Sequence, residues 1–171
     1  TTLVNAYLVP VMLRYLKKLD RKLQGKGVVT PQCYAMQSNG GVSTFSRAGE
    51  EAVTTILSGP AGGVVAGARI GKMVQVANLI TFDMGGTSCD VSLIRDGNPL
   101  VNVRGKVAGH DLGVPMLDIT TVSAGGGTMA RLDEVGLLQV GPQSAGAVPG
   151  PVCYGKGGEF PTVTDANLVL G

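Results

Sequence analysis

The segment from Thr81 to Ser92 constrains the fold of this chain more than any other part of its sequence. It reads Thr-Phe-Asp-Met-Gly-Gly-Thr-Ser-Cys-Asp-Val-Ser, so that apolar residues lead into Asp83 and a second acid, Asp90, opens the next apolar run. This pattern predicts two β-strands joined by a tight glycine turn. Glycines without Cβ atoms let a backbone approach a ligand closely and leave consecutive N–H groups free for phosphate oxygens.

These residues suit the phosphates of a nucleotide together with a metal ion. A carboxylate at the end of a strand, here Asp83, can hold Mg²⁺ through the waters that magnesium retains. We expect Gly85 and Gly86 to contact phosphate, Thr87 to donate its hydroxyl, and Asp90 to hold the loop. An ordinary Gly-Gly hairpin without a ligand is the alternative interpretation of the same residues.

A helix of small residues is predicted just before this hairpin. Residues 57–68 read Leu-Ser-Gly-Pro-Ala-Gly-Gly-Val-Val-Ala-Gly-Ala, with Pro60 suited to the first turn and Ser58 or Gly59 to the cap. Glycines inside a helix cost up to about 1 kcal/mol each. We therefore expect another backbone to pack closely against one small-residue face, made of Gly62, Gly63, Ala66 and Gly67.

The remaining elements follow from periodicity and turn residues. A turn at 96–99 and a further apolar run to residue 103 predict a three-stranded antiparallel meander. Elsewhere we expect a helix to about residue 24, strands near 32–38, 53–57, 116–122 and 137–140, and a helix beginning near 165. We also expect a short helix or turn near 46–51 and a short helix between the glycine loop and the strand near 137.

Two other glycine loops are candidates for ligand contact. Asn39 follows a predicted strand in Met-Gln-Ser-Asn-Gly-Gly and could hydrogen-bond a substrate or phosphate, although an ordinary Asn-Gly turn explains it equally well. Gly125, Gly126 and Gly127 also follow a strand and fit a loose dinucleotide fingerprint. Because residues 143–152 lack the acid that such a fingerprint requires, we reject NAD binding but keep a nucleotide contact.

Composition excludes several classes of function. A formal charge of +2, 15% charged residues and 4% aromatic residues provide neither a basic tract nor a stacking platform, so we expect no nucleic acid partner. No apolar run is long enough to span a membrane. Three distant cysteines and one histidine form no zinc motif, and we expect reduced thiols in a cytoplasmic protein.

The order of these elements resembles that of the actin-like, sugar-kinase and heat-shock-chaperone ATPases. Within that superfamily the chain is similar to the hydantoinase A/5-oxoprolinase family. The resemblance spans nearly the whole chain and rests on Met36-Gln-Ser-Asn-Gly-Gly41, Ser58-Gly-Pro-Ala-Gly-Gly63, Phe82-Asp-Met-Gly-Gly-Thr87, Ala124-Gly-Gly-Gly127, Gly141-Pro-Gln-Ser-Ala-Gly146, Pro149-Gly-Pro-Val-Cys-Tyr-Gly155 and Thr164-Asp-Ala-Asn167.

This resemblance implies an α/β, actin-like (ribonuclease H-like) fold with parts of two lobes. Residues 1–71 would form the C-terminal part of the first lobe and end in the helix that crosses between lobes, and residues 72–171 would begin the second lobe. The superfamily's first phosphate loop does not occur in the sequence. We therefore expect the chain to be a middle segment of a longer protein.

The resemblance also implies an activity. Members of the family use ATP with Mg²⁺ to open a cyclic amide such as a hydantoin or 5-oxoproline. The resemblance further implies that Asp83 binds the metal ion and is catalytic. Expected partners are the small cyclic amide, the rest of the same chain, and a second (B-type) subunit or fused domain. Alternatives are ATP-dependent activation of a ketone for carboxylation, as in acetone carboxylase, and a nucleotide-gated module without chemistry of its own.

Overall fold

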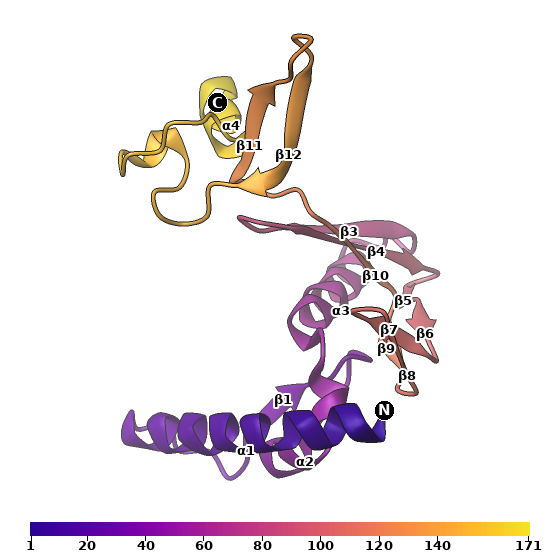
Figure 1. The fold of residues 1–171 in the computed structure, drawn as a ribbon. Coiled ribbons are helices and arrows are strands. Elements are labelled where there is room, and N and C mark those ends of the chain that lie inside the picture. Colours follow the sequence, from indigo (N-terminus) through magenta and orange to yellow (C-terminus); the bar gives the residue numbers. More distant parts are fainter. The chain divides into compact units, whose positions relative to one another are not determined.

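The computed structural model describes residues 1–171, which form two compact units (Figure 1). Unit 1 comprises Thr1–Thr81 and Ser92–Ile119, and unit 2 comprises Phe82–Val91 and Thr120–Gly171. These units are defined by contacts within this chain alone. The two lobes predicted at 1–71 and 72–171 therefore stay a prediction.

Helix α1 (Thr2–Gly25) opens unit 1 and matches the predicted helix, including Pro10 within it. It packs against α2 (Phe45–Glu50) and the 3-10 helix η1 (Ala52–Thr55). Asn5 fixes this packing, because its amide donates to the Glu50 carbonyl at 2.9 Å and accepts from the Val53 N–H at 3.0 Å.

The strand predicted at 53–57 is wrong, because η1 occupies most of that stretch. The hydroxyls of Thr54 and Thr55 donate to the carbonyls of Glu51 and Ala52 at 2.8 and 2.7 Å. Such local hydrogen bonds compete with strand pairing and favour a turn. The strand predicted at 32–38 is confirmed as β1 (Tyr34–Met36), which pairs antiparallel with β2 (Val42–Thr44).

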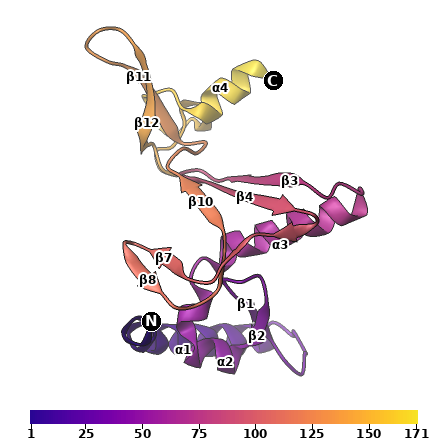
Figure 2. The same ribbon diagram turned by 90° about the vertical axis from the view of Figure 1, so that its right-hand side faces the viewer.

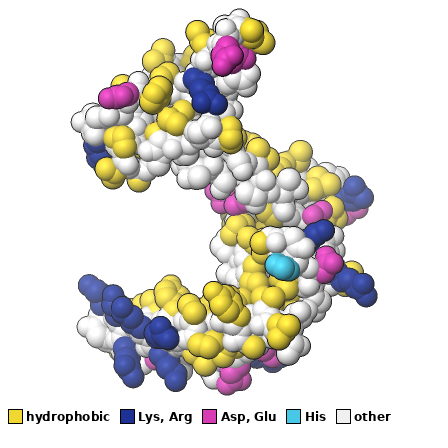
Figure 3. Space-filling model, in the orientation of Figure 1, with side chains coloured by type: hydrophobic (Ala, Val, Ile, Leu, Met, Phe, Trp, Pro, Cys, Tyr) yellow, Lys and Arg dark blue, Asp and Glu magenta, His cyan; other side chains and the backbone are white.

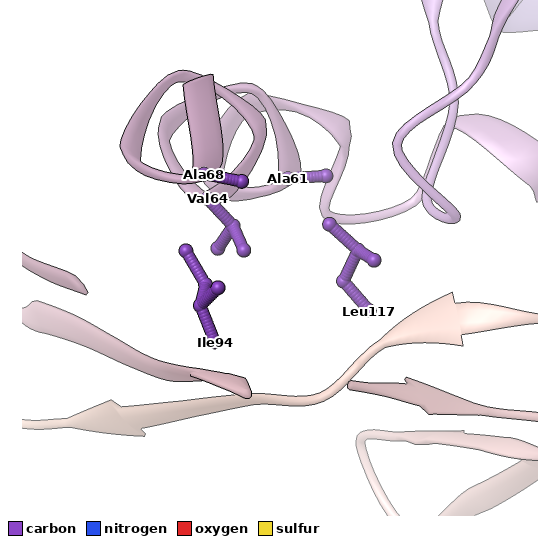
Figure 4. Packing of buried hydrophobic residues seen from close by; sticks show 5 residues of the cluster. All are labelled: Ala61, Val64, Ala68, Ile94 and Leu117. Atoms are coloured by element: carbon purple, nitrogen blue, oxygen red, sulfur yellow. The ribbon is translucent and has the colours of Figure 1, made fainter. Parts of the chain in front are cut away.

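Helix α3 (Ser58–Met73) confirms the predicted small-residue helix but not its cap. Its N-cap is Leu57, in the left-handed region at φ 59°, and no side chain caps the helix. One face packs on Ile94 and Leu117 and forms one of the two buried clusters of unit 1 (Figure 4). The buried residues of the helix are Ala61, Val64, Ala68 and Gly71.

The prediction that another backbone packs against the small-residue face of α3 is wrong within this chain, because the one close contact of that face is with a side chain. Gly67 is in close contact with the Thr81 side chain, whereas Gly63 and Ala66 are exposed. A close approach to backbone occurs instead at Gly71, outside the predicted face, where a Cβ would lie 2.8 Å from the Val76 carbonyl oxygen. The buried positions recur every three or four residues, as expected for a helix that presents one stripe to a sheet.

A sheet lies beside α3 and contains β3 (Leu79–Met84), β4 (Cys89–Arg95) and β10 (Ile119–Val122). The order of these strands in the sheet is β10-β4-β3 (Figure 2). The predicted meander is only partly correct. Its third strand pairs with β4 over just two residues, β5 (Asn98–Pro99), and β6 (Val101–Asn102) then pairs with β9 (Met116–Leu117). Pro99 has no N–H to extend the ladder. The strand predicted at 116–122 is divided at Asp118 into β9 and β10.

One hairpin of unit 1 was not predicted. Strands β7 (Gly105–Val107) and β8 (His110–Leu112) pair antiparallel, and Leu112 contributes to a second buried cluster with Val53, Val114 and Met116.

Unit 2 contains the hairpin of β11 (Thr128–Leu132) and β12 (Leu138–Ser144), the 3-10 helix η2 (Val152–Tyr154) and helix α4 (Val163–Leu170). The short helix predicted between the glycine loop and the strand near 137 is wrong, because β11 and the turn that follows it lie there. The Asp133 carboxylate accepts the N–H groups of Val135 and Leu137 at 3.0 and 2.9 Å. This turn closes the hairpin and so favours strands on either side of it.

None of the helices is long and apolar enough to cross a membrane. Basic side chains gather at the C-terminal end of α1 (Figure 3) and belong to Arg14, Lys17, Lys18, Arg21 and Lys22.

Candidate phosphate-binding site

The turn between β3 and β4 lies within unit 2 and keeps several backbone donors free. The N–H of Gly85 donates to the Ser88 carbonyl at 2.9 Å and closes the turn. The N–H groups of Gly86, Thr87 and Ser88 make no hydrogen bond to the protein. Residues 82–87 are exposed. Successive backbone donors without partners on an exposed turn are the groups that backbone anion sites use.

A second glycine loop holds this turn in place. The N–H of Gly126 donates to the Gly85 carbonyl at 2.9 Å, and the N–H of Gly127 donates to the Gly86 carbonyl at 2.7 Å. A Cβ on Gly125 would lie 2.5 Å from the Thr87 nitrogen and 2.6 Å from the Gly86 carbonyl carbon. The two backbones therefore touch, and only glycine fits at position 125.

This packing changes what the predicted loop at 125–127 contributes. The N–H of Gly125 donates to the Thr128 hydroxyl at 2.7 Å, so all three glycine N–H groups of the loop have partners within the protein. In this conformation the loop supports the turn at Gly85 and Gly86 and offers no free N–H to phosphate. A direct contact between the loop and a nucleotide stays a prediction.

The free side of the turn is open. A Cβ on Gly86 would meet no heavy atom within 4 Å, and one on Gly85 would meet only the Ser88 carbonyl oxygen at 3.6 Å. Glycine therefore has a different role in each loop. Gly125 contacts the backbone of the turn, whereas Gly86 faces open space.

The two acids of the hairpin differ in their surroundings. Asp83 is exposed at the end of β3 and makes no hydrogen bond to the protein, whereas Asp90 accepts the Thr121 hydroxyl of β10 at 2.6 Å. Between them, Cys89 is 3% exposed, and burial raises the pKa of its thiol, with the charges of Asp90 and Asp83 acting in the same direction. Cys89 therefore stays a neutral, packed thiol, while Asp83 is free to bind a cation.

Helix α4 is attached to the same loop. The N–H and the hydroxyl of Thr164 both donate to the Gly126 carbonyl, each at 2.8 Å. Thr162 is the N-cap of this helix and forms a capping box with Asp165. This second attachment of the glycine loop was not predicted, although the Thr-Val-Thr-Asp sequence carries the capping signal.

Asp165 has a structural role. Its carboxylate accepts the N–H groups of Val152 and Cys153 at 3.2 and 2.7 Å, and the N–H and hydroxyl of Thr162 at 2.7 and 2.8 Å. Desolvation works to raise its pKa, but the hydrogen bonds from Cys153 and Thr162 hold the pKa well below its ordinary value. Asp165 thereby ties η2 to the start of α4.

Asn39 belongs to unit 1 and lies in the turn between β1 and β2. Its side-chain oxygen accepts the Gly41 N–H at 2.8 Å, which is the local bond of an Asn-Gly turn. It also lines a pocket of about 400 Å³. Its contact with a substrate or phosphate stays a prediction.

The chain has no cluster of three or more His, Cys, Asp or Glu side chains able to hold a metal ion. A single exposed carboxylate, Asp83, is the donor available beside the free N–H groups. This donor set does not suit zinc, which takes several His or Cys ligands. It suits Mg²⁺, which keeps most of its waters and takes one or two carboxylates together with phosphate oxygens.

Comparison with known proteins identifies the family of this chain. The model of the hydantoinase/oxoprolinase family matches residues 1–171. The chain belongs to this family. It is 50% identical over 171 residues to the caprolactamase subunit alpha of Pseudomonas jessenii and 48% identical over 177 residues to 5-oxoprolinase 1 of Arabidopsis thaliana, and both matches cover 100% of the chain.

Solved structures show the same fold. The crystal structure of the ATP-dependent caprolactamase from Pseudomonas jessenii matches with a TM-score of 0.75 and 46% identity over 100% of the chain. The nucleotide-free structure of acetone carboxylase matches 91% of the chain with a TM-score of 0.74 and 32% identity. The α/β fold predicted from the sequence is confirmed.

This family member spans only part of its relatives. It covers 24% of the caprolactamase subunit alpha, 13% of the 5-oxoprolinase, and 25% and 22% of the two solved chains.

Proposed function

We propose that this chain holds the phosphates of ATP in an enzyme that hydrolyses a cyclic amide. The observation that carries the proposal is the turn at Gly85–Ser88, which presents three free N–H groups beside the exposed Asp83 carboxylate. Its support by a second glycine loop keeps these donors in place before a ligand binds, as electrostatic catalysis requires. The reaction class follows from relatives named as an ATP-dependent caprolactamase and a 5-oxoprolinase.

Each residue of the site has a proposed role. Gly86, Thr87 and Ser88 donate N–H groups to phosphate oxygens, and the Thr87 hydroxyl adds a further donor. Asp83 holds Mg²⁺ through its bound waters, and the ion, when bound, neutralises part of the phosphate charge. Asp90 fixes the second strand through Thr121.

The proposed chemistry is phosphoryl transfer followed by hydrolysis. The lactam oxygen attacks the γ-phosphorus, the bond from that phosphorus to the ADP oxygen breaks, and the phosphorylated lactam carbon then accepts water. Cleavage of the C–N bond then frees the amine and leaves an acyl phosphate, and a second water hydrolyses this acyl phosphate to give free phosphate and the open amino acid. The residues of this chain contribute positioning and charge stabilisation, which are the main protein terms in phosphoryl transfer.

The substrate, the other wall of the site and further partners are proposed to come from outside this chain. The relative from Pseudomonas jessenii is named as subunit alpha, which supports a second subunit or a fused domain as partner. A cytoplasmic location, proposed here as well, rests on three cysteines that are all free.

Phosphate release by the purified full-length protein tests this function. We expect release from ATP to depend on a cyclic amide, with caprolactam, 5-oxoproline and hydantoin as the first candidates, and to require Mg²⁺. Equal release with and without every cyclic amide would instead favour a nucleotide-gated module without chemistry of its own.

A second candidate function is ATP-dependent activation of a ketone for carboxylation. It is supported by the TM-score of 0.74 with acetone carboxylase. The same assay distinguishes the two functions, because phosphate release would then require acetone or acetophenone together with bicarbonate and would not respond to cyclic amides.

A further inference from the structure

A pocket in unit 1 has the features of a second ligand site. Its volume is about 400 Å³, within the range of roughly 300–1,000 Å³ that is typical of small-molecule sites. It lies between α3, the Asn39–Gly40 turn and the turn that joins β4 to β5. Its apolar lining residues are Val65, Ala68, Pro99, Val101 and Leu117.

Two cations line the same pocket. Arg69 and Lys72 are three residues apart on α3 and therefore lie on one side of the helix. The Lys72 side chain extends over the turn of β4 and β5, since its Cε lies 3.9 Å from where a Cβ on Gly97 would stand. Neither cation forms an ion pair, because the ion pair of this chain joins Arg47 and Glu51.

The acids near the pocket do not neutralise this charge. Asp96 and Asp118 adjoin lining residues in sequence, but neither lines the pocket, and the Asp118 carboxylate accepts the Asn102 amide at 2.9 Å. Asn39 adds a donor, because the Gly41 N–H occupies its amide oxygen and leaves its NH₂ group available. The pocket therefore combines an apolar wall with two uncompensated cations and an amide donor.

We propose that this pocket binds a small organic carboxylate with an apolar body. The carboxylate would contact Arg69 and Lys72, and the apolar body would cover Val65 and Leu117. Inorganic phosphate fits less well, because it would leave the apolar wall in contact with a strongly hydrated ion. The proposal stands on the pocket alone and is independent of the nucleotide site at Gly85–Ser88.

Binding of three probes to the full-length protein, measured by isothermal titration, tests the proposal. We expect hexanoate to bind at least about tenfold more tightly than hexanamide, which has the same apolar chain without the charge, and more tightly than inorganic phosphate. Equal binding of hexanoate and hexanamide, tighter binding of phosphate, or no binding of hexanoate would each overturn the proposal.

A pair of double variants locates the site. Replacing Arg69→Gln and Lys72→Gln should weaken hexanoate binding at least about tenfold. Replacing Lys17→Gln and Lys18→Gln removes the same charge from α1, away from the pocket lining, and should leave binding unchanged. If both double variants weaken binding equally, the effect is one of net charge and the proposed site is wrong. If a double variant does not fold, the binding of hexanoate, hexanamide and phosphate to the unmodified protein still tests the proposal.

Discussion

Gly125 lies where the backbones of two glycine loops meet, and we predict that even one methyl group there destabilises the protein. In Gly125→Ala the new Cβ would stand 2.5 Å from the Thr87 nitrogen and 2.6 Å from the Gly86 carbonyl carbon, whereas ordinary contacts begin at 3.4 Å. Because both neighbours are backbone atoms, no side chain can rotate away. The two loops must separate by roughly 1 Å or distort.

The expected cost follows from the contacts that this separation breaks. The hydrogen bonds from Gly126 to Gly85 and from Gly127 to Gly86, at 2.9 and 2.7 Å, would be stretched beyond effective length. Each contributes about 1 kcal/mol, and overpacking adds about 1–3 kcal/mol. We therefore expect Gly125→Ala to lower the free energy of unfolding by about 3–5 kcal/mol.

Gly86→Ala is the matched control, because its Cβ would meet no atom within 4 Å. It should change the free energy of unfolding by less than about 0.5 kcal/mol, as is usual for exposed positions. It should nevertheless weaken ATP binding at least about tenfold, since the methyl group occupies the space proposed for phosphate. Urea unfolding and titration with Mg-ATP measure the two effects. A stable Gly125→Ala protein, or a Gly86→Ala protein as unstable as Gly125→Ala, would refute this assignment of the two loops.

Three further predictions concern stability. Thr164→Val removes the hydroxyl that donates to the glycine loop and should cost about 1 kcal/mol in urea unfolding, while nucleotide affinity falls less than in Gly86→Ala. Gly67→Val should lower the melting temperature because Gly67 contacts the Thr81 side chain, whereas Gly63→Val, at an exposed position, should change it much less. The pKa of Asp165 is lower in the folded protein than its ordinary value of about 3.9. The ionised carboxylate should therefore stabilise the fold fully well above pH 4, and this stabilisation should be lost as the pH falls below that value. Asp165→Asn should accordingly flatten the dependence of the melting temperature on pH in this acid range.

Sequence patterns within a short segment predict the helices and strands that are determined by residues close together in the chain. The hairpin around Gly85 and Gly86, helix α1 and the small-residue helix α3 all follow from apolar periodicity and turn residues within a dozen positions. The exposed turn beside Asp83 was predicted in the same way, because the acid, the glycines and the threonine are adjacent in the sequence.

Contacts between distant residues could not be predicted from local patterns. The sequence predicts that Gly125–Gly127 contact a nucleotide and gives no sign of their packing on the turn, where the N–H groups of Gly126 and Gly127 donate to carbonyls about forty residues earlier in the chain. Glycine permits close approach of either a ligand or another backbone, and the sequence does not distinguish them. The predicted meander is incomplete for a similar reason, since the partner of β6 is β9, beyond the β7–β8 hairpin.

The most direct test of the proposed phosphate site is Asp83→Asn in the full-length protein, which keeps the shape of the side chain and removes its charge. We predict that phosphate release dependent on a cyclic amide falls by about 100-fold or more, with an unchanged melting temperature, because Asp83 is exposed and makes no hydrogen bond to the protein. Asp90→Asn, whose oxygen can still accept the Thr121 hydroxyl, should reduce the rate much less. Phosphate release by Asp83→Asn at close to the unmodified rate would contradict a nucleotide site at this turn.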